Sequence, residues 1–183
     1  MESEADLRQR WDHMFFGVRR SARYHQCRRR FYDRVDRLYS IASLVFGSAA
    51  FVSVLQGHDA KIFALWASGC VAVFGIVNLV WGSAMRARDH SDFMRRYVQL
   101  EQRMLQPPSE ALLKSIAEAR LGIESDEPPA LRVLDCICHN EQVRADGGSP
   151  DEYVPIGFFQ RLFSPFFDIC AHSLTKVKDK SKP

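Results

Sequence analysis

Two long apolar runs dominate the pattern of hydrophobic and polar positions along the chain. Residues 38–55 and 62–85 contain no Asp, Glu, Lys, Arg or His, and only the polar connector 56–61 separates them. Eighteen uncharged residues are enough to cross a bilayer as a helix, and twenty-four cross it with some tilt. The pattern predicts a two-helix transmembrane hairpin, and the alternative is a buried hairpin inside a soluble helical domain.

Helical periodicity continues on both sides of the hairpin. In residues 4–37, apolar positions recur at three- and four-residue steps, and no strong breaker separates them from the first run. After the second run, Phe93, Tyr97, Leu100 and Met104 keep such a seam until the prolines at 107–108 stop it. We therefore expect one helix over 4–55 and another over 62–106.

The rest of the chain also predicts helices, which makes the fold class all-α. A helix is expected over 109–121, with Ser109 as its N-cap and Gly122 as its stop, followed by a loop over 123–129 and a helix over 130–144. The organisation is then a cytosolic amphipathic helix (1–37), the hairpin (38–85), a cytosolic helical region (86–170) and a basic disordered tail (171–183). A phenylalanine-rich stretch, 156–169, lies either at the membrane interface or over the cytosolic helices.

Charge adds an orientation to this picture. Residues 1–37 carry ten Arg against six acids, arginines also follow the second run, and the connector has only Lys61. The positive-inside rule then predicts that both termini are cytoplasmic. Membrane topology explains the basic excess without nucleic acid, the late start of the first apolar run disfavours a cleaved signal peptide, and the five cysteines should be reduced thiols.

Small residues along both predicted spans indicate close helix packing. They form one stripe on each span. Each stripe can pack against the other helix of one hairpin or against a neighbouring protomer of a homo-oligomer. The principal members are Ser43, Gly47, Ser68, Ala72, Gly75 and Gly82. Asn78 is the one strongly polar side chain inside either span, and it either bonds across helices or lines an aqueous lumen. No ring of charges is present, so such a lumen would be unselective.

Three polar groups outside the spans are candidates for binding a ligand or for catalysis. An arginine cluster suits lipid headgroups or a nucleotide phosphate; it comprises Arg23, Arg28, Arg29, Arg30 and Arg34. Cys136, Cys138 and His139 invite a zinc hypothesis, but the C-x-C spacing is unlike structural zinc motifs, and Cys170 with His172 is the only second pair of ligands in the sequence. No nucleophile, glycine-rich loop or second carboxylate accompanies His139, Asn140 and Glu141. We therefore expect these residues to make a structural or regulatory contact and not to catalyse a reaction. No metal or cofactor is predicted.

Several short motifs in this order resemble one known family. An Arg-rich helix entering a membrane span is followed by acidic and proline-containing motifs; the pieces are Arg23-Tyr24-His25, Phe31-Tyr32, Gly47-Ser48-Ala49-Ala50, Ile123-Glu124, Glu127-Pro128-Pro129, Leu134-Asp135 and Cys138-His139-Asn140-Glu141. The layout resembles the SLATT family, the SMODS- and SLOG-associating two-transmembrane effector domains of bacteria. The likeness covers roughly residues 8–170, and its specificity lies in the order of the motifs around the hairpin.

The resemblance implies a function that the residue pattern alone does not. It implies a bacterial inner-membrane effector of anti-phage defence that oligomerises and perforates the membrane when a nucleotide-signal sensor fires. Its partners would be the lipid bilayer, further copies of itself, and a nucleotide second messenger or the sensor of that messenger. The competing expectation is a membrane anchor that forms no pore and recruits a cytosolic partner. This chain shows no separate sensor domain, so the route of the signal stays open.

Overall fold

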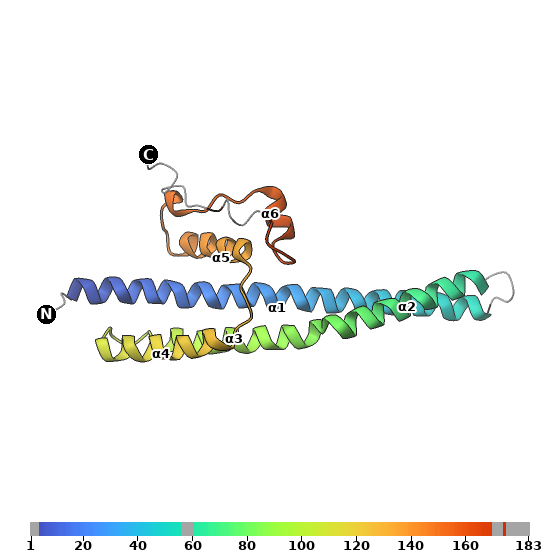
Figure 1. Cartoon of the computed structure of the whole chain (residues 1–183), viewed down its shortest axis with the longest axis horizontal. Coiled ribbons are helices and arrows are strands. Elements are labelled where there is room, and N and C mark those ends of the chain that lie inside the picture. Colours follow the sequence, from blue (N-terminus) through green and yellow to red (C-terminus); the bar gives the residue numbers. More distant parts are fainter. Residues whose placement is uncertain (1–3, 56–60, 170–173, 175–183) are drawn as a thin grey trace. The chain divides into compact units, whose positions relative to one another are not determined.

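The structure, a computed structural model, describes residues 4–55, 61–169 and 174, and these residues form helices and no strand (Figure 1). The helices are α1 (Glu4–Leu55), α2 (Lys61–Trp81), α3 (Ser83–Arg103), α4 (Glu110–Asp126), α5 (Arg132–Ala145), the short 3-10 turn η2 (Pro150–Glu152) and α6 (Phe158–Phe163). The predicted all-α class is confirmed. Residues 56–60 of the connector, together with most of the predicted tail, lie outside the described residues.

The chain divides into two compact units. Unit 1 comprises residues 1–28 and 90–183, and unit 2 comprises residues 29–89. The long helix α1 contributes to both, because it runs from Glu4 to Leu55 as predicted. α3 also contributes to both, since it begins at Ser83 and continues to Arg103.

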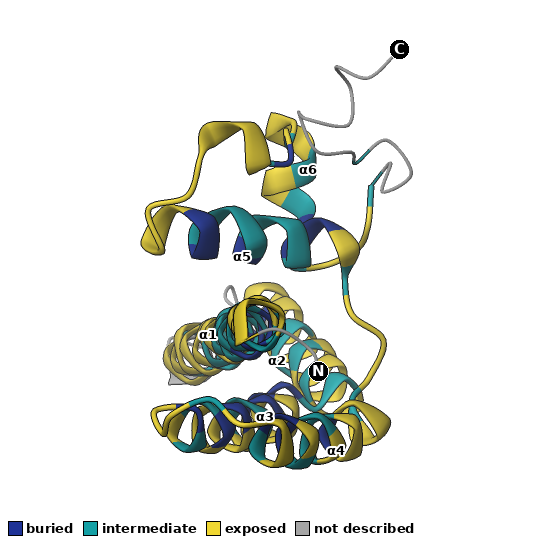
Figure 2. Cartoon of the chain, turned by 90° about the vertical axis from the view of Figure 1, so that its left-hand side faces the viewer, coloured by how far each residue is buried: buried dark blue, intermediate teal, exposed yellow. Residues whose placement is uncertain are grey.

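Unit 1 has a conventional apolar core. α1, α3 and α4 supply it, and its buried members are Trp11, Val18, Tyr97, Leu100, Met104, Leu113, Ile116 and Ile123. Figure 2 shows these buried positions as dark stripes along otherwise exposed helices. The recurring apolar positions from Leu7 to Ala22 and the predicted seam from Phe93 to Met104 lie in or against this core.

The boundaries of α4 differ from the prediction at one end. Its N-cap is Ser109, as expected, and the Ser109 side chain accepts a hydrogen bond from the backbone N–H of Leu112 at 3.3 Å. The expected stop at Gly122 is wrong, because α4 continues to Asp126. Ile123 is buried in the core, and this burial carries the helix past a glycine that would otherwise favour termination.

Unit 2 exposes most of its large apolar side chains. Two helical stretches, Glu4–Val52 and Ile62–Arg103, are long and apolar enough to cross a membrane, and the apolar windows within them are 0% and 11% buried. The corresponding window in the core helix of a soluble protein would be mostly buried. Within the unit, Phe74 of α2 contacts the rings of Tyr39 and Phe46 of α1, with centroids 6.4 and 5.8 Å apart.

The second apolar run is not one uninterrupted helix. Gly82 adopts a positive φ of 61° and separates α2 from α3. Only glycine takes this backbone conformation at little cost. The predicted helix over 62–106 is therefore interrupted at this one residue, inside the predicted 62–85 span, although backbone hydrogen bonds from Gly82 to Asn78 and from Arg86 to Gly82 continue across it.

Candidate functional site: a buried histidine network

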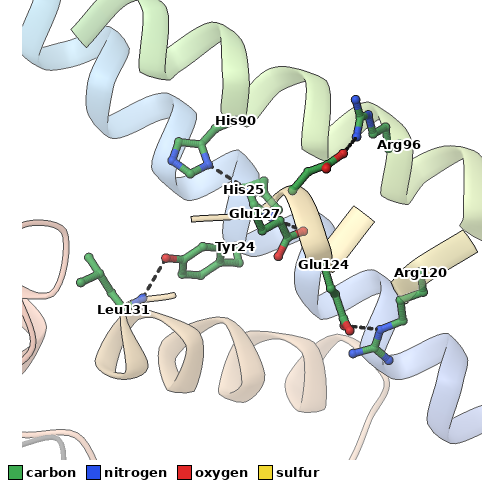
Figure 3. A network of polar contacts seen from close by, with 9 residues as sticks. Tyr24, His25, His90, Arg96, Arg120, Glu124, Glu127 and Leu131 are labelled. Atoms are coloured by element: carbon green, nitrogen blue, oxygen red, sulfur yellow. Dashed lines mark hydrogen bonds and ion pairs between the residues drawn. The ribbon is translucent and has the colours of Figure 1, made fainter. Parts of the chain in front are cut away.

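Two buried histidines and a carboxylate form a polar network inside unit 1. His25 of α1 and His90 of α3 are 2% and 4% exposed, and their Nδ1 atoms lie 2.9 Å apart. On the other side of the His25 ring, Nε2 lies 3.0 Å from Oε1 of Glu127, the residue that follows α4 (Figure 3). The histidine network therefore ties α1 to α3 and to the end of α4.

The geometry of the histidine network fixes where its protons lie. A carboxylate oxygen accepts hydrogen bonds, so Nε2 of His25 carries a proton and donates it to Glu127. The two Nδ1 atoms share a single proton, because two N–H groups facing each other at 2.9 Å would repel. In its neutral form His25 accepts at Nδ1, and His90 donates.

Aromatic rings enclose the His25 imidazole. Tyr97 stacks on it with centroids 5.7 Å apart and an interplanar angle of 17°, and Phe93 lies 5.2 Å away. The ring of Tyr24 approaches edge-on at 5.3 Å. Burial raises the pKa of Tyr97 well above its usual range, and Glu127 raises it further, so this phenol stays protonated at physiological pH.

The histidine network does not have the shape of a metal site. Its two hydrogen bonds leave His25 from opposite ring nitrogens, so His90 and Glu127 lie on opposite sides of that ring and cannot share one ion. Among the described residues, no group of three His, Cys, Asp or Glu side chains has a metal-binding arrangement. Cys170 and His172, the second pair of ligands that a zinc site at Cys136 and Cys138 would need, lie outside the described residues.

Tyr24 and a cluster of arginines attach α5 to α1. The Tyr24 hydroxyl accepts a hydrogen bond from the backbone N–H of Leu131 at 2.9 Å, just before α5 begins. Arg23 donates to the buried Gln142 at 2.7 Å, and Arg20 lies 3.3 Å from Asp135. One face of α1 thus binds α3 and α4 through His25, while a neighbouring face binds α5.

The two thiols beside Tyr24 are not poised for chemistry. The neighbouring Cys27 thiol and burial together raise the pKa of Cys138 far above its usual range. A thiol must be deprotonated to act as a nucleophile or a metal ligand. Cys138 is accordingly a core residue, packed with Tyr24 and Leu134.

The predicted arginine cluster is divided by the structure. Arg23 binds Gln142, and Arg28 donates to the carbonyl of Pro165 at 2.6 Å. Both belong to unit 1 and hold tertiary contacts. Arg29, Arg30 and Arg34 are exposed in unit 2, where Arg29 pairs with Asp33 at 3.6 Å.

The His139-Asn140-Glu141 motif meets the segment that follows α5. Asn140 exchanges two hydrogen bonds of 2.8 Å with the backbone of Val154, as a paired strand would. His139 Nε2 lies 3.2 Å from the carbonyl oxygen of Glu152, and its ring meets Phe16 edge-on. His139 and Asn140 thus attach α5 to the segment that follows it.

The candidate residues of the spans lie in unit 2, away from this network in sequence. Asn78 Oδ1 accepts a hydrogen bond from the Ser83 hydroxyl at 2.7 Å, across the interruption at Gly82. At Gly47 and Gly75, an added Cβ would meet no atom of this chain within 4 Å. Ser43 is half-buried, whereas Ser68 and Ala72 are exposed, so these small residues are not buried against a helix of the same chain.

A cavity of about 200 Å³ opens beside the histidine network. Its lining is mostly charged or polar, and comprises Arg20, Ser21, Tyr24, His25, Arg120, Glu124, Glu127, Ala130 and Asp135. Known small-molecule sites are typically larger than about 300 Å³. Its charges are also paired with one another, as Arg120 is with Glu124 at 2.7 Å. The cavity offers a nucleotide neither the volume nor free cations.

Sequence reasoning missed the histidine network, although a signal was present. The seam Phe93, Tyr97, Leu100, Met104, extended back by three residues, reaches His90. On α1, seven-residue steps from Trp11 through Val18 reach His25. A titratable residue at a core position of each helix indicates a buried pair.

Comparisons with protein-family models, with curated proteins and with solved structures find no match. Several of the motifs named from the sequence contact one another in unit 1, whereas Phe31-Tyr32 and Gly47-Ser48-Ala49-Ala50 lie in unit 2. Tyr24 contacts Leu131 beside the Leu134-Asp135 motif, His25 contacts Glu127, and Arg20 contacts Asp135. Segments far apart in the sequence are thereby brought into one polar and aromatic cluster.

Proposed function

We propose that this chain is a bacterial inner-membrane effector whose two spans assemble with those of other copies and form or gate a pore in nucleotide-signal-linked anti-phage defence. Both termini would be cytoplasmic. The observation that carries the membrane placement is the exposure of unit 2's apolar side chains, including Leu65, Leu79 and Val80. A water-soluble protein does not expose so large a contiguous apolar surface.

Support for assembly comes from the small residues of the spans. In lipid, helices associate through close packing, and small residues allow their backbones to approach. At Gly47 and Gly75, no atom of the same chain occupies the space that a Cβ would enter. That space is open to a helix from another protomer.

The assembly surface is tested by a matched pair of glycine variants. Gly75→Leu places a large side chain on the proposed stripe, and Gly69→Leu places it off the stripe; both positions are open within the chain. We expect Gly75→Leu to lose the oligomer on gentle detergent extraction, and Gly69→Leu to retain it, as read by native mass spectrometry. An unchanged oligomer in both variants would remove this stripe as an assembly surface.

Pore activity is tested at Asn78. Asn78→Leu should dry a lumen, because hydrophobic constrictions close by dewetting, while membrane insertion is kept because Leu favours lipid. Once the system is triggered, potassium leakage from cells expressing the native protein should exceed leakage with Asn78→Leu at equal membrane abundance. Equal leakage in the two would place Asn78 outside the pore.

The hydrogen bond from Ser83 to Asn78 provides the control for that test. Ser83→Ala removes the bond and keeps the amide. If Asn78 acts by wetting a lumen, Ser83→Ala should leak like the native protein. If Asn78 instead acts by holding the backbone around Gly82 through its bond to Ser83, Ser83→Ala should reduce leakage as Asn78→Leu does.

The competing function is a membrane anchor that recruits a cytosolic partner and forms no pore. The engagement of Asn78 by Ser83 favours it, because a satisfied amide need not face water. Native protein that never leaks, together with a monomer on extraction, would replace the pore by the anchor.

A further inference from the structure

The phenylalanine-rich segment, residues 156–169, presents exposed aromatic side chains on unit 1. Phe158 and Phe159 of α6 are 76% and 68% exposed, and Phe166 and Phe167 are about half exposed. Leu162 is exposed on the same short helix. Elsewhere in the described part of unit 1, most large apolar side chains pack in or against the core, and Val98, Leu105 and Leu121 are exposed singly. Such a patch on such a unit marks a surface that another apolar phase covers.

This segment is fastened to the body of unit 1 at several points. Asp168 accepts hydrogen bonds from the backbone N–H groups of Arg132 and Val133 at 2.9 and 3.0 Å. It thereby caps α5, whose own N-cap residue, Leu131, provides no side-chain cap. The exposed phenylalanines are therefore displayed by a fixed structure.

Further bonds hold the two arms of the segment together. Gln160 accepts from the backbone N–H of Gly157 at 2.9 Å and donates to the carbonyl of Ile169 at 3.2 Å. Phe163 stacks on Phe167 with centroids 5.7 Å apart. The segment keeps its shape through polar backbone contacts and leaves its largest apolar side chains outside.

One anchor of the segment lies on α1, close in sequence to the first apolar run. Arg28 donates to the carbonyl of Pro165, and α1 continues without a break from Arg28 to Leu55. Leu38, where the apolar run begins, follows ten residues later in the sequence.

The charges around the aromatic patch suit anionic lipid. Arg161 is exposed on α6, between Phe159 and Leu162. Beyond Ile169, residues 170–183 carry four lysines and one aspartate. Exposed aromatic residues combined with cations are the composition that binds the boundary between headgroups and acyl chains, and anionic lipids strengthen this binding.

We propose that residues 156–169 form a lipid-facing foot, whose exposed phenylalanines insert into the interface of an anionic bilayer. The foot rests on the membrane placement proposed above, and not on pore formation. It would hold α5 and α1 at the membrane surface, because Asp168 caps α5 and Arg28 of α1 binds Pro165.

The test is site-specific photo-crosslinking of the full chain in lipid vesicles. A benzophenone amino acid replaces Phe159 in one variant, Leu65 of α2 in a second and Leu121 of α4 in a third; all three side chains are more than half exposed. The vesicles contain phosphatidylcholine alone or mixed with phosphatidylglycerol, and mass spectrometry identifies each adduct. Phe167 serves as a second foot position if the change at Phe159 disturbs folding.

We expect lipid adducts at Phe159 about tenfold above those at Leu121, the difference that burial of one aromatic side chain supports. The Phe159 adduct should rise when phosphatidylglycerol is present, and Arg161→Glu should remove that rise. Leu65 should react with lipid in every vesicle.

Each contrary outcome has one meaning. A covalent dimer at Phe159, in place of a lipid adduct, would show that a second copy covers the patch, and would overturn the foot. Lipid adducts at Leu65 but not at Phe159 or Phe167 would also overturn it, while leaving the spans in place. No lipid adduct at Leu65 would contradict the membrane placement itself.

Discussion

Units 1 and 2 treat large apolar side chains in opposite ways. In unit 1, Trp11, Tyr97 and Ile116 are buried, and even the polar His25 is enclosed and paired. In unit 2, the large side chains from Leu38 to Val80 are mostly exposed, and two of its few buried residues are the small Ala64 and Ala67. Unit 1 thus buries apolar side chains as a protein in water does, whereas the exposed apolar side chains of unit 2 are those that a bilayer would cover under the proposed membrane placement.

The largest expected effect comes from charging the exposed side of unit 2. A lysine in each apolar run, Val45→Lys with Val73→Lys, should cost about 6 kcal/mol of membrane insertion, at about 3 kcal/mol per lysine near a helix centre. The fraction of protein that resists alkaline extraction from membranes should fall sharply.

A matched double variant in unit 1 sharpens this result. Leu105→Lys with Leu121→Lys also replaces exposed apolar residues, but we expect them to face water. Membrane retention should then be unchanged, since exposed substitutions away from special features have small effects. Equal loss in both pairs would remove the distinction between the units.

The core of unit 1 should respond to truncation. Ile116 is fully buried, so Ile116→Ala should lower the free energy of unfolding by about 2–5 kcal/mol through lost burial and a cavity. Leu121→Ala, on the same helix but exposed, is the control and should change little. The thermal unfolding midpoint in mild detergent measures both, and equal midpoints would contradict a packed core at α4.

The histidine network should give a smaller effect. Glu127→Ala leaves the buried Nε2–H of His25 without its acceptor, at a cost of about 1–3 kcal/mol. Glu127→Gln keeps an acceptor oxygen and should restore most of the loss. Glu124→Ala, which removes a partly exposed pair with Arg120, should cost less than about 1 kcal/mol. A Glu124→Ala loss equal to that of Glu127→Ala would contradict the assigned role of His25.

The smallest effect is a loss of unit 1 stability at alkaline pH. Burial raises the pKa of Tyr97 in the folded state, so the folded state holds its proton more tightly than the unfolded state does. Stability from this group is complete below pH about 10 and falls as pH rises beyond it. In unfolding midpoints measured between pH 8 and 11, Tyr97→Phe should reduce the alkaline loss, while Tyr24 and Cys138, whose pKa values are also raised, retain part of it.

Periodicity predicted the helices of unit 1 because their apolar positions repeat at regular steps. It did not predict the break at Gly82, since glycine is tolerated within membrane helices and its positive φ depends on the local bonds around Asn78 and Ser83. It also ended α4 too early, because the burial of Ile123 is a tertiary effect.

The histidine network was harder to foresee than the helices. His90 and Glu127 lie 65 and 102 positions after His25 in the sequence, and only the fold brings the three residues together. Tyr24 and His25 belong to one short motif of the sequence and Glu127 to another, and the sequence itself does not indicate that they pair. Their partners follow from how α1, α3 and α4 pack, which a single sequence does not specify.

Quenching of native tryptophans by brominated lipid tests the difference between the units most directly. Trp66 of unit 2 is 72% exposed, and Trp11 of unit 1 is 5% exposed. One variant keeps only Trp66, through Trp11→Phe and Trp81→Phe; the other keeps only Trp11, through Trp66→Phe and Trp81→Phe. In vesicles with bromines on the acyl chains, Trp66 fluorescence should be strongly quenched, and Trp11 fluorescence should be unchanged. Trp66 fluorescence that does not respond to brominated lipid would contradict the assignment of unit 2 to the membrane.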